Sequence, residues 1–335
     1  MENDCIALKW SRINAQGTYL SAAVVAVAVA IGLVGCDSGG GHGPSSTGPW
    51  TNSLGMVFIP VKGTRANFCI WPTRVKDFGA FANATDYRAE SAISTFAWRT
   101  HQIAKHPLGS RKNPGFVQAP DHPVVCVNWA DADAFCRWLT AKEHDTGVLP
   151  KGKRYRLPTY EETKEALAFK IGYVKNGRQG TGPFDLDLEP QEPWPAKSLR
   201  ETSVNLFPWG NLWPPPPGAG NLADRRFTAE YGQANLEYTS RELQAYDDGF
   251  AATSPVGQFQ PSSTGLYDMA GNVICWLGER FPQGRDVFGT VVWPNSQYGS
   301  AWDSYEVSEL PSANIRGAPG ETRQDDVGFR CVIGN

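Results

Sequence analysis

The segment Gly265–Trp276, GLYDMAGNVICW, decides the fold, because it combines turn-forming glycines with polar and large apolar side chains. Glycine adopts positive φ angles at little cost, so Gly265 and Gly271 predict tight turns. Three large side chains are expected to pack inward: Tyr267, Met269 and Trp276. The oxygen-bearing side chains of Asp268 and Asn272 leave a calcium loop and a catalytic loop open as alternatives to a structural floor.

The composition favours a loop-rich domain without a polyanionic partner. The 335 residues carry a formal net charge of −3, so nothing points to nucleic acid. Hydrophobic residues make up 41% of the chain, which is enough for a sizeable core. The 35 glycines and 25 prolines predict much irregular backbone.

Helices are expected at three places, all in the N-terminal half. One follows Thr73, and another follows Asn128. In the second helix four residues recur on one face at helical spacing: Ala132, Phe135, Cys136 and Leu139. A third helix begins at Thr159, which forms a capping box with Glu162. Helical periodicity largely vanishes after residue 170.

Two strands are expected at the ends of the domain. One covers Met56–Val61, and GFRCVI at residues 328–333 predicts the other. A few helices followed by a long loop-rich half and a closing strand indicate an α+β fold rather than a parallel α/β sheet.

The N-terminal residues are expected to be an export signal. Leu20–Val34 is an uncharged apolar run of 15 residues, shorter than the roughly 20 that a membrane span needs. The run ends in LVGC at 33–36, which resembles a bacterial lipobox, so residues 1–35 are predicted to be removed and Cys36 to be lipidated. Residues 36–49 are then a Gly/Ser-rich tether and residues 50–335 the domain. The protein is expected to be exported and lipid-anchored at a bacterial membrane, on its periplasmic face or at the cell surface. The alternative is a plain transmembrane anchor.

An exported domain folds in an oxidising compartment, where disulfides persist. Beyond Cys36 the sequence has five cysteines: Cys69, Cys126, Cys136, Cys275 and Cys331. Because five is odd, at least one of them is expected to be unpaired. No CxxC motif occurs, which argues against a zinc ribbon.

Seven segments, taken together and in order, resemble the formylglycine-generating enzyme (sulfatase-modifying factor) family, a branch of the C-type lectin-like fold. The matching segments are Asn52–Val61, His122–Leu139, Tyr155–Glu162, Pro208–Asn211, Asp248–Val256, Gly265–Trp276 and Gly328–Cys331. The resemblance spans essentially the whole domain and implies a C-type lectin-like α+β fold. It implies no particular activity, because one fold hosts many functions.

The resemblance implies a disulfide between Cys136 and Cys331, because relatives pair a cysteine of the first large helix with that of the final GFRC strand. Such a bridge closes a loop of nearly 200 residues and would stabilise the domain by roughly 4–5 kcal/mol. Two buried free thiols are the alternative. The pairing of Cys69, Cys126 and Cys275 stays open.

The resemblance also implies structural calcium. One site in relatives matches Asn221, Leu222, Asp248 and Phe250, with Leu222 and Phe250 acting through main-chain oxygens. At a second site Asn272 matches, but Ile274 and Cys275 replace the usual Trp-Glu pair, so a carboxylate is lost. The segment Gly265–Trp276 is therefore expected to be mainly a structural floor, and the plain alternative for the first site is a set of turns.

Copper is not expected. Oxidase members of the family hold Cu(I) with two nearby cysteines in the C-terminal loop region, since this soft ion prefers thiolates. The equivalent residues here, 285–314, contain no cysteine, histidine or methionine. The chain is therefore interpreted as a non-catalytic relative. The alternatives are a formylglycine-generating oxidase acting on sulfatase cysteines and a divergent enzyme on the same scaffold.

The C-terminal loops have the composition of a binding surface, in which aromatic side chains supply contact area and polar groups supply orientation. The predicted ligand-binding residues are Trp293, Asn295, Tyr298, Trp302, Asp303, Tyr305, Arg316 and Arg323. The expected ligand is a protein, a peptide or a glycan. The same fold branch includes surface lipoproteins whose C-terminal segment is diversified by retroelements, so a diversified variable protein is one version of the expected function. The alternative for Trp293 and Trp302 is a place in the core.

Overall fold

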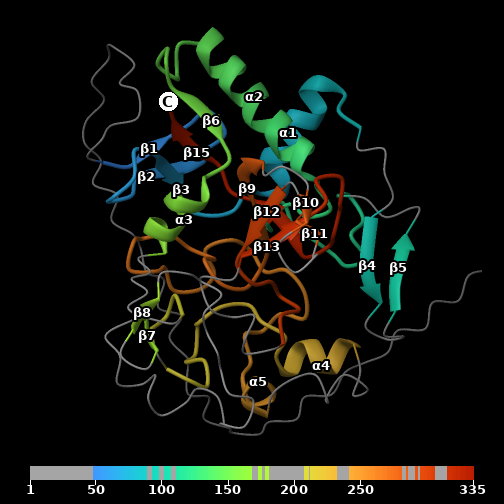
Figure 1. Cartoon of the computed structure of the whole chain (residues 1–335). Helices are drawn as coiled ribbons and strands as arrows, with labels where there is room; N and C mark the ends of the chain where they lie inside the picture. Colours follow the sequence, from blue (N-terminus) through green and yellow to red (C-terminus); the bar gives the residue numbers. More distant parts are fainter. Residues whose placement is uncertain are drawn as a thin grey trace, which may run out of the picture. The chain divides into compact units, whose positions relative to one another are not determined.

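The computed structural model (Figure 1) describes most of the predicted domain. The described residues are 48–88, 93–97, 102–106, 111–167, 173–175, 178–180, 207–210, 212–231, 241–280, 284–285, 291–292, 295–305 and 315–335. The predicted export signal, Cys36, most of the predicted tether and Trp293 lie outside these residues.

Two sheets organise the described residues. The first has the order β1-β2-β3-β15-β6, with β1 at Trp50–Thr51, β2 at Val57–Pro60, β3 at Asn67–Cys69, β15 at Val332–Gly334 and β6 at Arg154–Arg156. The second has the order β13-β12-β9-β14, with β13 at Ile315–Ala318, β12 at Asn295–Tyr298, β9 at Ile274–Arg280 and β14 at Val327–Phe329. All pairings in the two sheets are antiparallel except that of β14 with β9.

Three two-stranded hairpins complete the strands of the described residues. They are β4 (Ile93–Ala97) with β5 (Gln102–His106), β7 (Tyr173–Lys175) with β8 (Arg178–Gly180), and β10 (Gly284–Arg285) with β11 (Val291–Val292). The expected strand over residues 56–61 is confirmed as β2, shorter by one residue at each end.

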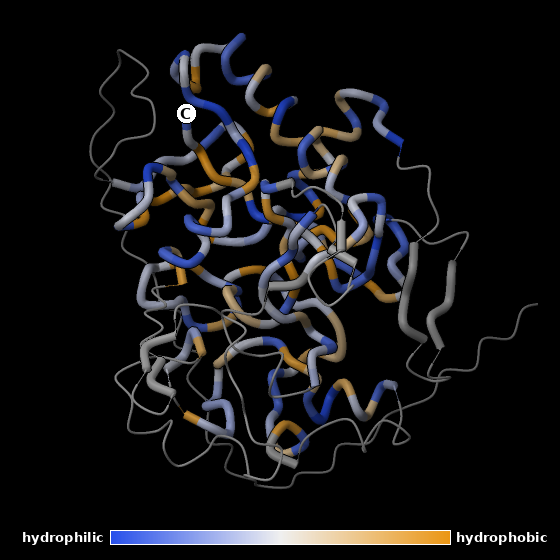
Figure 2. Tube along the Cα trace, viewed as in Figure 1, coloured by the Kyte–Doolittle hydropathy of each residue, from blue (hydrophilic) through white to orange (hydrophobic). Residues whose placement is uncertain are grey.

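The three expected helices are confirmed as α1 (Val75–Thr85), α2 (Trp129–Asp145) and α3 (Tyr160–Ala166). Short-range polar contacts begin each of them. In α2, Asn128 Oδ1 accepts from the Asp131 amide at 2.9 Å, and Asp131 Oδ2 accepts from the Asn128 amide at 2.9 Å. The predicted capping box of α3 forms in the same way, between Thr159 and Glu162. Figure 2 shows hydrophobic and hydrophilic residues alternating along α2, as expected for a helix with one buried face.

Two further helices occur in the half where no helix was expected: α4 (Arg225–Tyr231) and α5 (Arg241–Ala245). They have 7 and 5 residues, too short to display a helical repeat in the sequence. No helix among the described residues is both long and apolar enough to cross a membrane.

The expected final strand needs correction, because residues 328–333 contribute to two strands in different sheets. Gly328 in β14 lies opposite Cys275 of β9, whereas Val332 in β15 lies between Phe68 of β3 and Arg156 of β6. Arg330 and Cys331 join the two strands, and both are fully buried. The chain therefore passes through the interior here, a course that alternating hydrophobicity alone does not reveal.

The main core packs both sheets against α1 and α2. Phe135 of α2 stacks on Phe78 of α1 with ring centroids 5.9 Å apart and meets Phe329 of β14 edge-on at 5.5 Å. Phe58 of β2 and Trp276 of β9 belong to the same buried cluster. The few helices, the two sheets and the long loops confirm the α+β fold class.

Candidate functional site

The segment Gly265–Trp276 forms a buried floor between the second sheet and the long loops. The predicted positive φ angles are confirmed, at +82° for Gly265 and +76° for Gly271. Met269 and Trp276 are buried as expected, whereas Tyr267 is only half-buried. Trp276 Nε1 donates to the Val127 carbonyl at 2.9 Å, which joins the floor to the loop before α2.

Asn272 is the polar centre of this floor. It adopts a φ of 65°, a left-handed conformation that asparagine tolerates better than most residues. Its side-chain Oδ1 accepts from the Ser254 amide at 3.0 Å, and its Nδ2 donates to the Ser254 carbonyl at 3.2 Å. Its carbonyl accepts from the Trp302 amide at 3.2 Å. One side chain and its backbone thus connect three loops that are distant in sequence.

Arg330 is a second buried connector. Its guanidinium donates to the main-chain carbonyls of Cys69, Tyr267 and Asp268 at 2.9, 2.5 and 3.2 Å. Its Nε donates to the Tyr298 hydroxyl at 3.3 Å. Carbonyl acceptors satisfy the donors of a charge that would otherwise be costly to bury. The sequence offered a signal in the GFRC motif, but not the identity of these partners.

Four of the predicted ligand-binding residues lie in the interior. The exposed fractions of Asn295, Tyr298, Trp302 and Arg323 are 4%, 2%, 1% and 6%. A side chain buried to this degree offers no contact area to a ligand, so the expectation of surface contacts is corrected for these four. For Trp302 the alternative of a place in the core is confirmed.

The neighbours of these side chains explain their burial. Trp302 packs against Phe116, Phe227 and Tyr231, with ring centroids 5.3, 5.9 and 5.7 Å away. Its indole Nε1 donates to the Asp325 carbonyl at 3.2 Å. The sequence could not distinguish this role from a contact role, because aromatic residues serve both cores and interfaces.

Arg323 forms a buried ion pair rather than a surface contact. Both of its terminal nitrogens contact the carboxylate of Asp131, with Nη2 to Oδ1 at 2.9 Å. Asp131 Oδ1 also accepts from the Tyr87 hydroxyl at 2.6 Å. Asp131 therefore caps α2, holds the end of α1 and anchors a C-terminal loop.

Two of the predicted contact residues, Asp303 and Tyr305, are partly exposed. Trp293 lies outside the described residues, and so does the side chain of Arg316, whose backbone belongs to β13. The predicted contact surface is thereby reduced, within the described residues, to the loop that follows β12.

The first predicted calcium site contains a buried side-chain oxygen, that of Asn221. Asn221 is 1% exposed, and no donor among the described residues reaches its Oδ1. Its Nδ2 donates to the Ala252 carbonyl at 2.8 Å, which orients the amide. The carboxylate of Asp248 accepts from the Leu222 and Phe250 amides, both at 2.8 Å, so all four predicted ligands lie together. These residues fit a hard cation that binds amide, carboxylate and main-chain oxygens.

Asp224 is a neighbour of this site that the sequence did not single out. Its Oδ2 accepts from the Asp248 amide at 2.6 Å, and its Oδ1 accepts from the Arg226 and Phe227 amides at the start of α4. Burial, and then the nearby charge of Asp224, raise the pKa of Asp248 to about 8. Among the described residues no group of three or more His, Cys, Asp or Glu side chains could hold a metal, and the predicted ligand set contains only one carboxylate.

The second predicted calcium site does not fit. Asn272 Oδ1 already accepts from the Ser254 amide at 3.0 Å and from Asn221 Nδ2 at 3.4 Å. Ile274 and Cys275, where relatives carry Trp-Glu, are buried and supply no carboxylate. The calcium role implied for Asn272 by resemblance therefore has no support from its contacts.

The predicted disulfide partners lie in contact as free thiols. The sulfurs of Cys136 and Cys331 are 3.5 Å apart, and Thr73 Oγ1 lies 3.6 Å from the Cys331 sulfur. Because a disulfide bond is about 2.05 Å long, the pair is adjacent but not bonded, and the bridge stays a prediction. Cys69, Cys126 and Cys275 are also buried free thiols.

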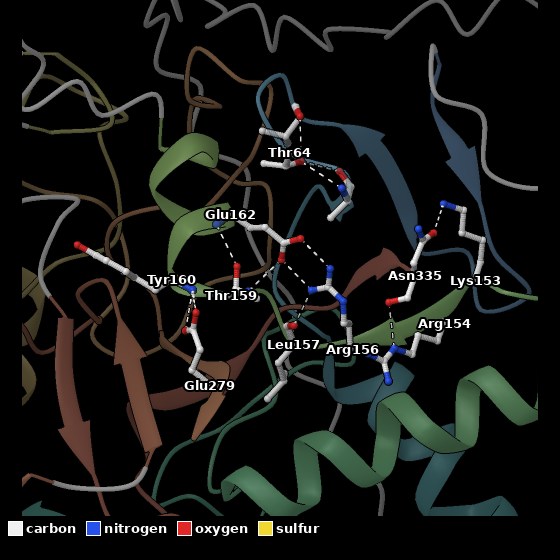
Figure 3. A network of polar contacts seen from close by, with 12 residues as sticks. Thr64, Lys153, Arg154, Arg156, Leu157, Thr159, Tyr160, Glu162, Glu279 and Asn335 are labelled. Carbon is white, nitrogen blue, oxygen red and sulfur yellow. Dashed lines mark hydrogen bonds and ion pairs between the residues drawn. The ribbon is translucent and has the colours of Figure 1, made fainter. Parts of the chain in front are cut away.

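Carboxylates around α3 have structural partners (Figure 3). Arg156 donates to both oxygens of Glu162 at 2.7 Å. Both oxygens of Glu279, in β9, accept from the Tyr160 amide at 2.8 and 2.7 Å. Negative charge at a helix N-terminus is stabilising, so these contacts account for the positions of both glutamates.

This arrangement of two sheets, a glycine-bearing floor and a buried GFR arginine is that of a C-type lectin-like α+β domain. The sequence matches the family described as the Sulfatase-modifying factor enzyme 1-like domain over residues 60–334. The chain therefore belongs to this family, and the recognition made from the seven segments is confirmed.

Individual relatives are distant. The Inactive C-alpha-formylglycine-generating enzyme 2 of Bos taurus is 24% identical over 293 residues, covering 79% of this chain and 76% of the relative. The formylglycine-generating enzyme of Thermomonospora curvata is 28% identical over 227 residues, covering 61% of this chain and 56% of that enzyme. The solved structure of PvdO from Pseudomonas aeruginosa aligns with a TM-score of 0.44 and 21% identity, covering 81% of this chain and 80% of that one.

Proposed function

We propose that this chain is a non-catalytic ligand-binding lipoprotein, held at a bacterial membrane by a lipid on Cys36 and presenting its domain on the tether of residues 36–49. It binds a protein, a peptide or a glycan, and not nucleic acid. The observation that carries the proposal is the lack of any cysteine, histidine or methionine between residues 285 and 314. That is the region where the oxidase members of the family keep the two cysteines that bind copper.

The remaining cysteines do not fit a copper site that serves a peptide substrate. Cu(I) prefers thiolates, and burial raises the pKa of Cys69 to about 12 and of Cys275 to about 11, which favours the neutral thiol. Cys136 and Cys331 lie close together, but they are 1% and 0% exposed within the aromatic core. A peptide substrate cannot reach either sulfur without unfolding of the core.

The names of two relatives support the proposal. The proteins of Bos taurus and Mus musculus that match 79% and 78% of this chain are both named inactive C-alpha-formylglycine-generating enzyme 2. Other members of the family are named formylglycine-generating enzymes. The rival function is therefore an oxidase that converts a sulfatase cysteine to formylglycine, or a divergent enzyme on this scaffold.

The decisive experiment is an oxidation assay on the purified full-length protein. It is incubated with Cu(I), dioxygen and a cysteine-containing sulfatase peptide, and the peptide mass is followed over time. We expect no conversion, while the formylglycine-generating enzyme of Thermomonospora curvata, run in parallel, serves as the positive control. Oxygen-dependent conversion that disappears in the Cys275→Ser variant would overturn the proposal.

The contact surface we propose is the loop after β12, which carries Asp303 and Tyr305. Both side chains are partly exposed, whereas their neighbours Trp302 and Ser304 are buried and hold the loop in place. The Ser304 hydroxyl accepts from the Ala301 amide at 3.0 Å, which stabilises the turn. In the narrower form of the proposal this surface is diversified, so that copies of the gene differ mainly within residues 290–326.

We also propose a structural calcium ion held by Asn221 and Asp248, with main-chain oxygens of Leu222 and Phe250. We expect calcium at about one hundred times its dissociation constant to add about 2.7 kcal/mol to the free energy of unfolding. Calorimetry in calcium and in chelator measures the shift in the unfolding temperature.

Two carboxylate variants sharpen the calcium test. Asp248→Asn should abolish the shift. Asp247→Asn should leave it intact, because Asp247 is paired with Arg225 and Arg226 at 2.7 and 3.0 Å. Equal unfolding temperatures in calcium and chelator for the wild-type protein would show that no such ion contributes.

A further inference from the structure

A pocket of about 510 Å³ lies at the C-terminal end of α1. Its polar lining comes from two short stretches: Asn83, Asp86, Tyr87, Arg88, Arg111 and Lys112. The volume lies within the range of small-molecule sites, about 300–1,000 Å³. Neither the family motifs nor the proposed contact surface includes any of these residues.

The lining is strongly cationic for a chain with a net charge of −3. Three of its side chains are cations and only Asp86 is an anion, a net charge of +2. Arg88 pairs with Asp86 at 3.4 Å, and the two side chains are 76% and 86% exposed. A pair so exposed contributes little, so Asp86 offsets only a small part of the charge of Arg88.

Arg111 is the lining cation whose environment most favours a bound anion. It is half-buried, and its guanidinium lies 5.5 Å from the centroid of the Phe78 ring. Within the described residues it forms no salt bridge with a carboxylate, and burial alone lowers its pKa. Partly desolvating a cation without a partner is costly. An anion bound in the pocket would offset that cost.

The wall behind Arg111 is rigid. Phe78 meets Phe81 edge-on at 5.2 Å, and Phe81 packs against Tyr87 at 4.7 Å. The Tyr87 hydroxyl donates to Asp131 at 2.6 Å, and this links the wall to the start of α2. A guanidinium placed over a fixed aromatic ring has a defined orientation before any ligand arrives, which reduces the entropy lost on binding.

We propose that this pocket binds the oxyanion group of a small ligand, a sulfate, phosphate or carboxylate, with Arg111 as the main contact and Arg88 as a supporting charge. The planar guanidinium donates two parallel hydrogen bonds to such groups. The proposal is independent of the proposed contact loop and of the lack of oxidase activity, so either can fail without the other.

The test is isothermal titration of the full-length protein in a neutral detergent. Sodium sulfate, phosphate and acetate are added separately at constant ionic strength, balanced with sodium chloride. We expect saturable binding of one anion per chain. Preference for sulfate or phosphate over acetate would identify a tetrahedral oxyanion, and the reverse preference would identify a carboxylate.

Variants locate the site. Arg111→Gln should weaken binding about tenfold or more, because it removes a charge-assisted hydrogen bond, and Arg111→Lys should lose less. Arg137→Gln is the matched control: it removes an arginine of α2 whose side chain is 72% exposed, and it should leave binding unchanged.

The Asp86→Asn variant distinguishes an effect on anion affinity from an effect on folding. Asparagine tolerates the φ of 47° at this position, and the substitution removes the carboxylate of the described lining. Binding should tighten about two- to fivefold, a gain that a poorly folded variant cannot produce. No saturable binding of any of the three anions, equal weakening by Arg137→Gln, or unchanged affinity in Asp86→Asn would overturn the proposal.

Discussion

Gly271→Ala should destabilise the domain by about 3–5 kcal/mol, because two separate costs act at one residue. Gly271 has a φ of +76°, a left-handed conformation that costs a residue with a side chain about 1–2 kcal/mol. A Cβ atom at this position would also lie 2.3 Å from the main-chain oxygen of Asn221. That oxygen accepts from the Asn272 amide at 2.9 Å, so the backbone cannot move away without breaking the floor.

Chemical denaturation followed by tryptophan fluorescence measures the loss in the free energy of unfolding. Gly147→Ala is the control, because Gly147 has a similar φ of +70° but no atom within 4 Å of an added Cβ. The control should lose only the conformational cost, about 1–2 kcal/mol. If both variants lose the same amount, the close approach of the Asn221 carbonyl contributes nothing, and the floor is less tightly packed than its contacts indicate.

Asp131→Ala should cost about 3–5 kcal/mol, the usual penalty for removing one partner of a buried ion pair. The side chains of Arg323 and Asp131 are 6% and 1% exposed, so the guanidinium would be left buried without its carboxylate. The substitution also removes the acceptor of the Asn128 amide at the start of α2 and that of the Tyr87 hydroxyl. Denaturant unfolding of the variant measures the change.

A double-mutant cycle tests whether the ion pair itself is responsible. Arg323→Met alone should also destabilise, and the double variant Asp131→Ala with Arg323→Met should lose less than the sum of the two by about 2 kcal/mol. Arg137→Met removes an exposed pair with Asp133 on the same helix and should cost at most about 0.5 kcal/mol. Strict additivity in the cycle would show that the ion pair has no coupling energy and that the other contacts of Asp131 account for the loss.

The sequence predicted the relevant property of Gly271 but not that of Arg323. The positive φ of Gly271 was expected from the residue type, since only glycine adopts such angles freely. The burial of Arg323 was not expected, because arginine is among the residues that are mostly exposed. Its partner Asp131 is 192 residues away in the sequence, and no local pattern connects them.

Some residues of the candidate site were also predicted correctly as neighbours, whereas others were placed wrongly. The set Asn221, Leu222, Asp248 and Phe250 was taken from the family resemblance, and the structure places these four residues together. The contact residues were inferred from composition, and four of them proved to be buried. Composition tells which types of side chain a segment contains, whereas the burial of each side chain depends on which other segments of the chain pack against it.

The sequence by itself determined the family, the start of each of the three main helices and the turns of the floor. The family is recognised from motifs whose order along the chain is itself part of the sequence, whereas the helix starts and the turns depend on residues within about four positions of one another, such as Thr159 with Glu162. Only the tertiary structure decided that residues 328–333 divide between two sheets and that Arg330 and Trp302 lie inside. Strand partners and burial are set by contacts between distant segments, and those contacts exist only once the chain has closed around its core.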